Sequence, residues 1–552
     1  MGGFIQRGLS VLVRRQTNIL SAAFVIMGTV VLSQILGLIR QRLLLATFGA
    51  SNILGIYNYS SQLPDAIFQL TIAAALSSAF IPVFSQYLTN NLHQQAYKVA
   101  STLLVFGLTI FAFVSILLAI GAPFFLQIFN LGGQFNSSQM TLMANLMRLM
   151  MVGELLFIIA TFFTAVLQSY NRFFLPGLAA ASYNLGIIIA IVFLSKPFGI
   201  FAVPLGVILG STIYICIQLP VVKYVGFSFH PSFSQDSLQG IKKIMKLMWP
   251  NMFSILISQL GIVGLAALIS YLVTPGRMHV IFDIAKTLAY APVVLFGLTI
   301  SQAALPVLSR EKDKPQEFRT TLLTSFNQML YLVLPISALI LILRIPLVRL
   351  VFGASGFDWS ATLLTGHVLI YLSFSIFAQA LTTLLTRGFY ALQDTRTPFI
   401  LSTISTAVMI IMGGIFVVEF HLGLESLAVA FAAGNILDLI LSMILLNKRI
   451  GGFDIRSLYI PMGKIVIATI FTGVALYIPI KLLDQLVFDT TRTINLILLS
   501  GISSLAGLML YLFLTWLLDV KEASTFLLLF KKVGNWREIL GERKEVIEGT
   551  DI

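Results

Sequence analysis

Apolar runs of about 20 residues follow one another along almost the whole chain, and they constrain its fold more than any other feature. A helix of that length crosses the hydrocarbon layer of a bilayer and satisfies its own backbone hydrogen bonds there. Only 10% of the 552 residues are charged, against about 25% in soluble domains. The sequence therefore predicts an all-α, polytopic membrane protein with no large soluble domain.

Hydropathy, with turn residues taken as breaks, predicts fourteen transmembrane helices and hence both chain ends on one side. The predicted spans are 19–46, 53–87, 99–128, 139–168, 173–195, 198–220, 240–271, 278–309, 319–346, 360–391, 397–418, 423–447, 461–482 and 493–518. Lysine and arginine are concentrated in the segments on the side of the chain ends, which the positive-inside rule identifies as cytoplasmic. The net charge of +13 thus indicates membrane topology rather than nucleic-acid binding.

An internal repeat is indicated by three matched pairs of residues that share one offset of 224: Pro82 with Pro306, Arg172 with Arg396, and Gly37 with Gly261. Six spans fit within this offset, and an even number gives both copies the same orientation. The pattern predicts two parallel six-helix repeats around a central cavity, as in transporters that move one half against the other. The last two spans lie outside the repeat.

The predicted organisation has five parts. They are a basic interfacial arm (1–18), an N-lobe of spans one to six (19–222), a cytoplasmic loop followed by a C-lobe of spans seven to twelve (223–450), spans thirteen and fourteen (451–520), and a cytoplasmic amphipathic tail (521–552).

Ionisable side chains inside a membrane are costly, so they commonly face a cavity or a partner. The candidates here are Arg40 and Arg42 in the first span, Asp65 in the second, Arg148 and Glu154 in the fourth, and Asp283 and Lys286 in the eighth. Arg40 lies about 10 Å below the outer end of its helix, at 1.5 Å per residue. We therefore favour a cavity position for Arg40, and snorkelling to the interface for Arg42, which lies nearer the end.

The remaining candidates do not all indicate a cavity. Asp283 and Lys286 are three residues apart on one helix face, which suits an internal ion pair as well as a substrate site. Arg148 suits the outer interface, whereas Glu154 is a candidate for the cavity.

Four prolines interrupt the second and eighth spans, namely Pro64, Pro82, Pro292 and Pro306. Because they fall at corresponding helices of the two repeats, they indicate either bent gating helices or static kinks. The sequence contains no HExxH, CxxC, nucleophile-elbow or P-loop pattern. These absences disfavour an enzyme and leave no predicted cofactor or metal.

Several motifs together resemble the MurJ (MviN) family of lipid II flippases, which belongs to the superfamily of multidrug, oligosaccharidyl-lipid and polysaccharide exporters. They are SxxLGxxR in the first span, LP followed by SxAFxP in the second, and GFYALQDTRTP at 388–398, on a background of fourteen spans and a repeat. The resemblance covers essentially the whole chain.

The family's cavity residues are only partly kept. The family pattern has charged residues, mostly arginines, at the places of Gln34, Gln41, Phe68 and Gln69, and a Glu-Gly at Ala73 and Ala74. One arginine survives as Arg40, and Lys286 stands near the family's charged pair in the eighth span. The resemblance implies a cavity in which Arg40 and Lys286 hold a lipid pyrophosphate. We take Gln34, Gln41, Asp65, Asp283 and Arg42 as further candidate residues of the cavity, and Gly37 with the four prolines as candidate positions of helix kinks or gating.

The function implied is translocation of lipid II from the cytoplasmic to the outer leaflet of the bacterial cytoplasmic membrane by alternating access. Spans thirteen and fourteen would form a groove for the polyprenyl tail, and the chain would act as a monomer among membrane lipids, with cell-wall synthesis proteins as further partners. The alternatives are export of another lipid-linked glycan or of a drug, and a non-transporting scaffold for cell-wall synthesis. Whether an ion or the membrane potential drives transport stays open.

Overall fold

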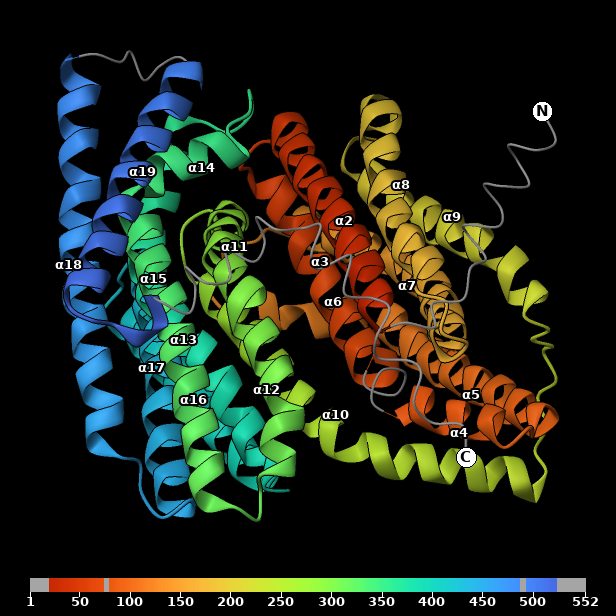
Figure 1. Ribbon diagram of the computed structural model, residues 1–552. Helices are drawn as coiled ribbons and strands as arrows, with labels where there is room; N and C mark the ends of the chain where they lie inside the picture. The colour runs from red at the N-terminus through yellow and green to blue at the C-terminus, as the bar shows by residue number, and fades with distance from the viewer. Residues whose placement is uncertain (1–18, 74–78, 487–492, 524–552) are drawn as a thin grey trace, which may run out of the picture. The chain divides into compact units, whose positions relative to one another are not determined.

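The computed structural model describes residues 19–73, 79–486 and 493–523 (Figure 1). These residues form helices joined by turns, with no strand among them, so the all-α prediction is confirmed. The predicted basic arm, the tail from residue 524 onward and the family position Ala74 lie outside the described residues.

The elements are named in chain order. Those of the first half are α2 (Ile19–Phe48), α3 (Asn52–Phe68), η1 (Gln69–Ala73), α4 (Ile81–Thr89), α5 (His93–Ile120), α6 (Ala122–Phe125), η3 (Leu126–Asn130), α7 (Ser137–Ser169), α8 (Phe174–Phe198), η4 (Gly199–Phe201), α9 (Ala202–Tyr224) and α10 (Gln235–Ile269). Those of the second half are α11 (Pro275–Pro292), η5 (Val293–Leu298), α12 (Thr299–Arg310), α13 (Pro315–Ile342), α14 (Arg344–Phe352), α15 (Trp359–Ala391), α16 (Arg396–Gly414), η6 (Ile415–Glu419), α17 (Leu424–Arg449), α18 (Ile455–Leu486) and α19 (Thr493–Leu517).

Twelve stretches of the described residues are long and apolar enough to cross a membrane, which makes the chain a multi-pass membrane protein. One of these stretches, Phe174–Tyr224, contains both α8 and α9, joined by the short η4. The second predicted span, which contains α3, η1 and α4 with residues 74–78 outside the described residues, is not among the twelve. The predicted count of fourteen spans is therefore not confirmed and stays a prediction.

The third predicted span is too long at its C-terminal end. It was expected to reach residue 128, but α5 ends at Ile120 and the chain continues as the short α6 and η3. Gly121 follows the last helical residue and Pro123 comes two residues later, and a proline cannot supply the N–H that a continuing helix needs. Hydropathy does not reveal this break, because the sequence is apolar on both sides of it and hydropathy carries no information on backbone geometry.

Two π-helical segments support the internal repeat. The segment η1 begins at Gln69 in the second span, and η5 begins at Val293 in the eighth. These positions differ by 224, the offset that relates Pro82 to Pro306. A π segment widens one helical turn and is frequently found at functional sites. The two copies thus share a local helix distortion as well as a sequence pattern.

The chain divides into two compact units. The first contains the described residues up to Ile284 together with 351–365 and 402–430. The second contains 285–350, 366–401 and the described residues from Phe431 onward. These are units of packing, and the lobes expected from the repeat stay a prediction.

The first unit is built on closely packed helix pairs. The hairpin of α8 and α9 packs so tightly that a Cβ atom on Gly186 would collide with the backbone of Gly210. The helix α7 packs against both α3 and α9, and α2 packs against α8. Aromatic residues fill the interior, including Phe80, Phe84 and Phe162, whose exposed fractions are 0, 2 and 1%.

The first unit also brings distant loops into backbone contact at the ends of helices that are predicted to face outside. A Cβ on Gly55 of α3 would collide with Gly276 of α11, and a Cβ on Gly49 would lie 2.6 Å from the carbonyl oxygen of Gly356. The side-chain oxygen of Asn52 accepts a hydrogen bond of 2.7 Å from the Gly276 backbone N–H. These contacts pack the first unit tightly at the predicted outer ends of its helices.

In the second unit, α18 and α19 run side by side, and α18 packs on α13 (Figure 1). The hydroxyl of Tyr511 in α19 donates a 2.7 Å hydrogen bond to the backbone carbonyl of Tyr331 in α13. The two helices outside the repeat are therefore anchored to a helix within it.

Candidate functional site

Five polar side chains from four helices interact within the membrane-spanning part of the first unit. They are Arg40 of α2, Tyr57 and Asp65 of α3, Glu154 of α7, and Tyr183 of α8. We call these five residues the polar cluster. The packing of α3 on α7 and of α2 on α8 brings together residues that lie far apart in the sequence.

The two carboxyl groups of the polar cluster, Asp65 and Glu154, lie near enough to each other to interact electrostatically. Ser61, one turn before Asp65 in α3, donates its hydroxyl to the backbone carbonyl of Asn58 at 3.1 Å. Glu154 is only 4% exposed, whereas Asp65 keeps an accessible face. The Oε2 atom of Glu154 is buried and has no N–H or O–H donor among the described residues. Burial of such an oxygen is destabilising unless a hydrogen-bond donor or an opposite charge compensates it.

Arg40 supplies the positive charge of the polar cluster. It is half-buried and interacts electrostatically with Asp65 and Tyr57. Its Nε atom is buried and has no hydrogen-bond acceptor in the described part of the chain. A guanidinium has five N–H donors, and at least this one is not satisfied by the described residues. Its predicted role as a phosphate ligand stays a prediction.

The other predicted residues of α2 differ in how far their side chains are exposed. Gln34 and Arg42 are exposed, whereas Gln41 is half-buried. At Gly37 the helix runs on without a break, and a Cβ there would lie 3.9 Å from the side-chain amide of Asn184 in α8. That amide donates a 3.2 Å hydrogen bond to the Ser33 carbonyl, so this part of α2 is tied to α8.

Asp283 and Lys286 lie on α11, where both are half-buried. Each of them takes part in an interaction with another group of the chain. Whether Asp283 and Lys286 form an internal ion pair or part of a substrate site stays open.

Arg148 is held by the end of a neighbouring helix. Its Nε donates a 2.9 Å hydrogen bond to the carbonyl of Ala119, in the last turn of α5, and its Nη1 donates to Asn145 at the same distance. Cations are favourable at a helix C-terminus, where carbonyl groups lack partners. Arg148 therefore binds the C-terminal end of α5, and its predicted place at the outer interface stays a prediction.

The prolines flank the π segments. Pro64 lies inside α3 ahead of η1, and Pro82 is in the first turn of α4. Pro292 ends α11 directly before η5, and Pro306 lies inside α12. Phe68, where the resemblance leads us to expect an arginine, is buried, and its ring centroid lies 5.1 Å from that of Phe157. The role of the prolines in gating stays a prediction.

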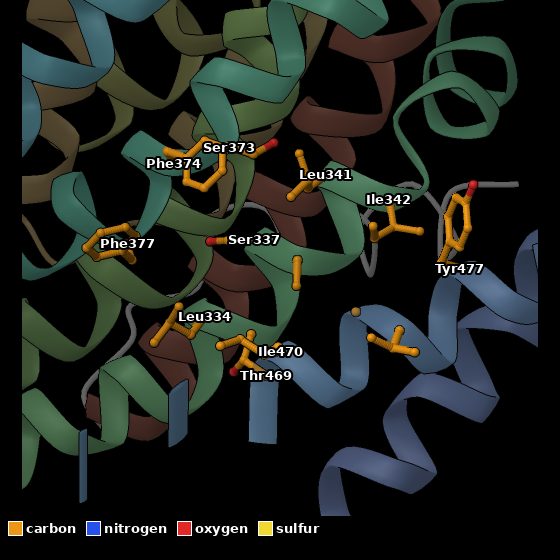
Figure 2. Close-up of a pocket in the computed structure, with 13 residues that line it drawn as sticks. Leu334, Ser337, Leu341, Ile342, Ser373, Phe374, Phe377, Thr469, Ile470 and Tyr477 are labelled. Atoms are coloured by element: carbon orange, nitrogen blue, oxygen red, sulfur yellow. The ribbon is translucent and has the colours of Figure 1, made fainter. Parts of the chain in front are cut away.

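An apolar pocket of about 440 Å³ lies in the second unit (Figure 2). It is lined by α13, α15 and α18, with Leu334, Leu341, Phe374, Phe377, Ile470 and Tyr477 among its side chains. Gly473 of α18 also lines it, and nothing lies within 4 Å of a Cβ placed there. Ser337, Ser373 and Thr469 are its hydroxyl-bearing residues. The apolar lining of the pocket suits a hydrocarbon chain. Of the last two helices, α18 lines the pocket and α19 does not.

Tyr57 and Tyr183 were not predicted as site residues. Tyr57 lies two helical turns from Asp65, so their shared face on α3 was a usable signal. Nothing in the sequence distinguishes Tyr183 from other aromatic residues of the spans.

Comparisons with known proteins agree on one family. The family model described as "Lipid II flippase MurJ" matches residues 44–496. The "Probable lipid II flippase MurJ" of Haemophilus influenzae is 25% identical over 484 residues, which cover 82% of this chain and 91% of the relative. The "Lipid II flippase MurJ" of Burkholderia cenocepacia is 25% identical over 444 residues, which cover 78% of this chain and 84% of the relative.

Solved structures share the fold. One described as "Lipid II flippase MurJ, inward closed conformation" has a TM-score of 0.73 at 21% identity, with 89% of this chain and 98% of that chain covered. An inward-facing multidrug resistance MATE family transporter has a TM-score of 0.65 at 15% identity, with coverages of 76% and 94%. At these identities the likeness concerns architecture alone.

Proposed function

Because this chain belongs to the lipid II flippase MurJ family, as the match over residues 44–496 shows, we propose that it translocates lipid II from the cytoplasmic to the outer leaflet by alternating access. The membrane would be the bacterial cytoplasmic membrane, with both termini inside. The observation that carries the proposal is this family match over most of the chain.

The polar cluster supports an anionic substrate. A pyrophosphate cannot enter hydrocarbon without partners, because an unpaired buried charge costs far more than thermal energy. Arg40 lies within a membrane span and keeps a buried Nε donor without an acceptor in the described residues. Charge-assisted hydrogen bonds from such a guanidinium are the interaction that phosphate oxygens require. Lys286 is the proposed second cation.

The apolar pocket supports a substrate with a long hydrocarbon chain. Its lining comes from three helices and is mainly aliphatic and aromatic (Figure 2). The polyprenyl tail of lipid II would lie against this pocket while the headgroup crosses through a polar path. We propose that the chain acts as a monomer in contact with membrane lipids, and that cell-wall synthesis proteins are its further partners.

A second candidate is export of a cationic drug, which the neighbouring carboxyl groups Asp65 and Glu154 favour. Arg40 opposes it, because this guanidinium interacts electrostatically with Asp65 and would repel a cation at the same place. A third candidate is a membrane scaffold that transports nothing.

Complementation separates these candidates. The chain is expressed in a bacterium depleted of its own lipid II flippase, and growth is scored for the wild type, Arg40→Ala, Arg40→Lys and Lys196→Ala. Lys196 is an exposed cation in the last turn of α8 and serves as the matched control. We expect growth with the wild type and with Lys196→Ala, little growth with Arg40→Ala, and partial rescue by Arg40→Lys. Absence of growth with well-expressed wild type would argue for a drug exporter or a scaffold.

A further inference from the structure

The apolar pocket lies toward one end of the helices that line it. Its residues on α13 run from Leu334 to Ile342, the last residue of that helix, and those on α18 run from Thr469 to Tyr477. In Figure 2, Ile342 and Tyr477 lie at one end of the pocket, and Leu334 and Thr469 lie toward the other. Each stretch rises about 12 Å, which is most of the roughly 15 Å of hydrocarbon in one leaflet. The pocket therefore fits within a single leaflet.

The predicted topology makes this the outer leaflet. With the N-terminus inside, the ninth span runs outward, and α13 is that span. The exposed ring of Tyr477 lies at the end of the pocket where α13 ends (Figure 2). Tyrosine is enriched where hydrocarbon meets water, because its ring is apolar and its hydroxyl is polar. The end marked by Ile342 and Tyr477 is therefore the end predicted to meet the outer surface.

Arg344 follows directly after this end of the pocket. Its Nη1 donates a 3.0 Å hydrogen bond to the carbonyl of Leu341, which is itself a lining residue. A Cβ on Gly366 of α15 would lie 3.7 Å from the Cγ of Arg344, so the stem of the arginine packs beside α15. Two turns further along α15, Ser373 lines the pocket. The guanidinium is therefore held next to the pocket by both α13 and α15.

The guanidinium of Arg344 is only partly satisfied by the described residues. Its bond to Leu341 is the one hydrogen bond that it makes to them, and its Nε is buried without an acceptor there. Its Nη2 also makes no hydrogen bond to those residues and is not fully buried, so it can donate to a ligand. Arg148 likewise binds a carbonyl in the last turn of a helix, but its Nε and Nη1 both have acceptors. Capping a helix end thus accounts for Arg148 better than for Arg344.

A second cation continues the lining face of α18. Gly473 and Tyr477 line the pocket four residues apart, and Lys481 follows at the next such step along the helix. The Lys481 side chain is exposed, and neither Lys481 nor Arg344 forms an ion pair with a side chain that the structure describes. The predicted outer end of the pocket thus carries two cations that lack a described counter-ion.

We propose that Arg344 and Lys481 are the phosphate ligands of a separate lipid site, where lipid II is held in the outer leaflet after translocation with part of its polyprenyl chain in the apolar pocket. This inference deepens the proposed function and rests on it. Charge decides the occupant, because a diphosphate brings two phosphate groups to two cations, whereas a bilayer phospholipid such as phosphatidylglycerol brings one. Arg40 would bind the headgroup within the first unit, and Arg344 would bind it on release.

The direct test measures lipid binding to the purified full-length chain by native mass spectrometry. The parent carries Arg40→Ala, which removes the ligand proposed for the polar cluster. The probes are polyprenyl diphosphate and polyprenol, which share the hydrocarbon chain and differ in the headgroup. We expect the parent to bind the diphosphate at least about tenfold more tightly than the alcohol. Arg344→Gln or Lys481→Gln, added to the parent, should weaken the diphosphate about tenfold through loss of a charge-assisted hydrogen bond.

Two controls accompany these variants. Polyprenol needs only the apolar pocket, so unchanged polyprenol binding shows that Arg344→Gln and Lys481→Gln still fold. Lys196→Gln is the matched charge control, because Lys196 is an exposed cation in the last turn of α8 and lies in the first unit. We expect Lys196→Gln to bind both probes like the parent.

Three results would overturn the proposal. In the first, the parent binds the two probes equally. In the second, neither Arg344→Gln nor Lys481→Gln weakens binding of the diphosphate. In the third, phosphatidylglycerol or cardiolipin displaces the diphosphate at equal concentration, since the site would then belong to a bilayer phospholipid.

The assignment to the outer leaflet has a test of its own. Cys216 is the only cysteine of the chain, so Lys481→Cys in a Cys216→Ser background leaves one thiol. We expect a membrane-impermeant maleimide to label this thiol in intact spheroplasts. Labelling only after lysis would place this end of the pocket on the cytoplasmic side and overturn its role in release.

Transport measurements separate this site from the proposed function. If the diphosphate binds through Arg344 and Lys481 but the wild type moves no lipid II in liposomes, the proposed function fails and the diphosphate-lipid site stands. If the wild type moves lipid II but both variants bind the diphosphate like their parent, the proposed function stands and the site fails.

Discussion

Gly55 of α3 and Gly276 of α11 pack backbone against backbone, so that neither position has room for a side chain. We predict that Gly55→Leu lowers the stability of the first unit by about 1–3 kcal/mol, as overpacked substitutions do. The measurement is the midpoint of thermal unfolding in detergent. Gly501→Leu is the matched control, because nothing lies within 4 Å of a Cβ at Gly501. Equal midpoints for the two variants would show that this contact is absent from the dominant state.

The ion pair between Arg277 and Asp358 should make stability depend on pH. The Arg277 Nη2 donates to both carboxylate oxygens of Asp358 at 2.9 Å. Desolvation opposes ionisation of Asp358, but hydrogen bonds from Arg277, Ser360 and the Ala361 backbone outweigh it and hold the pKa of Asp358 below its ordinary value. The contribution is therefore present above about pH 4, the usual range for an aspartate, and is lost as the pH falls through the lower folded-state pKa.

The variant that tests this pair is Asp358→Asn, which keeps a side-chain oxygen for the N–H of Ala361 but removes the charge. Both partners are partly exposed, so the loss of stability at pH 7 should be under about 1 kcal/mol and should shrink at high salt. Thermal midpoints of the wild type and the variant should converge in acid. A difference that is the same at pH 7 and in acid would rule out the ion pair as its cause.

Asp394 explains part of the GFYALQDTRTP motif, because it caps α16. Its Oδ1 accepts hydrogen bonds from the backbone N–H groups of Arg396 and Thr397 at 3.1 and 3.0 Å, and its Oδ2 accepts one from the Thr397 hydroxyl at 2.8 Å. We predict that Asp394→Ala costs about 0.5–2 kcal/mol in a thermal or denaturant unfolding measurement. Asp394→Asn should cost much less, since asparagine caps helices equally well. Equal losses in the two variants would assign the effect to charge rather than to capping.

The apolar pocket offers a matched pair of glycines on one helix. Gly473 lines the pocket, Gly463 does not, and neither has an atom within 4 Å of an added Cβ. Gly473→Phe should place a ring in the pocket and lower lipid II translocation about tenfold, equivalent to about 1.4 kcal/mol. Gly463→Phe should leave the translocation rate near that of the wild type. If both variants transport equally well, the pocket does not receive the tail.

The helices and the repeat were predictable because they depend on signals that run along the chain. Apolar length identifies a span, and the common offset of Pro82 and Pro306 recurs in the starting positions of η1 and η5. The end of α5 was missed, since Gly121 and Pro123 interrupt a run that stays apolar.

The composition of the polar cluster was less predictable. Arg40, Asp65 and Glu154 could each be singled out as ionisable residues in apolar spans, but their mutual arrangement depends on which helix faces meet. A span that is apolar on all sides carries little information on its neighbours. The proximity of Asp65 to Glu154 therefore follows only from the packing of α3 on α7. For the same reason, the apolar pocket looked like ordinary lipid-facing sequence.

We propose that this chain moves lipid II across a membrane with Arg40 as a phosphate ligand. Purified chain is reconstituted into liposomes that carry lipid II in one leaflet, and its appearance in the other leaflet is timed with an externally added headgroup-modifying enzyme. We expect clear translocation by the wild type over empty liposomes. For Arg40→Ala we expect a rate about 10 to 100 times lower, because a charged hydrogen bond of about 1.5–3 kcal/mol is lost. Wild-type rates equal to those of empty liposomes, or equal rates for the wild type and Arg40→Ala, would contradict it.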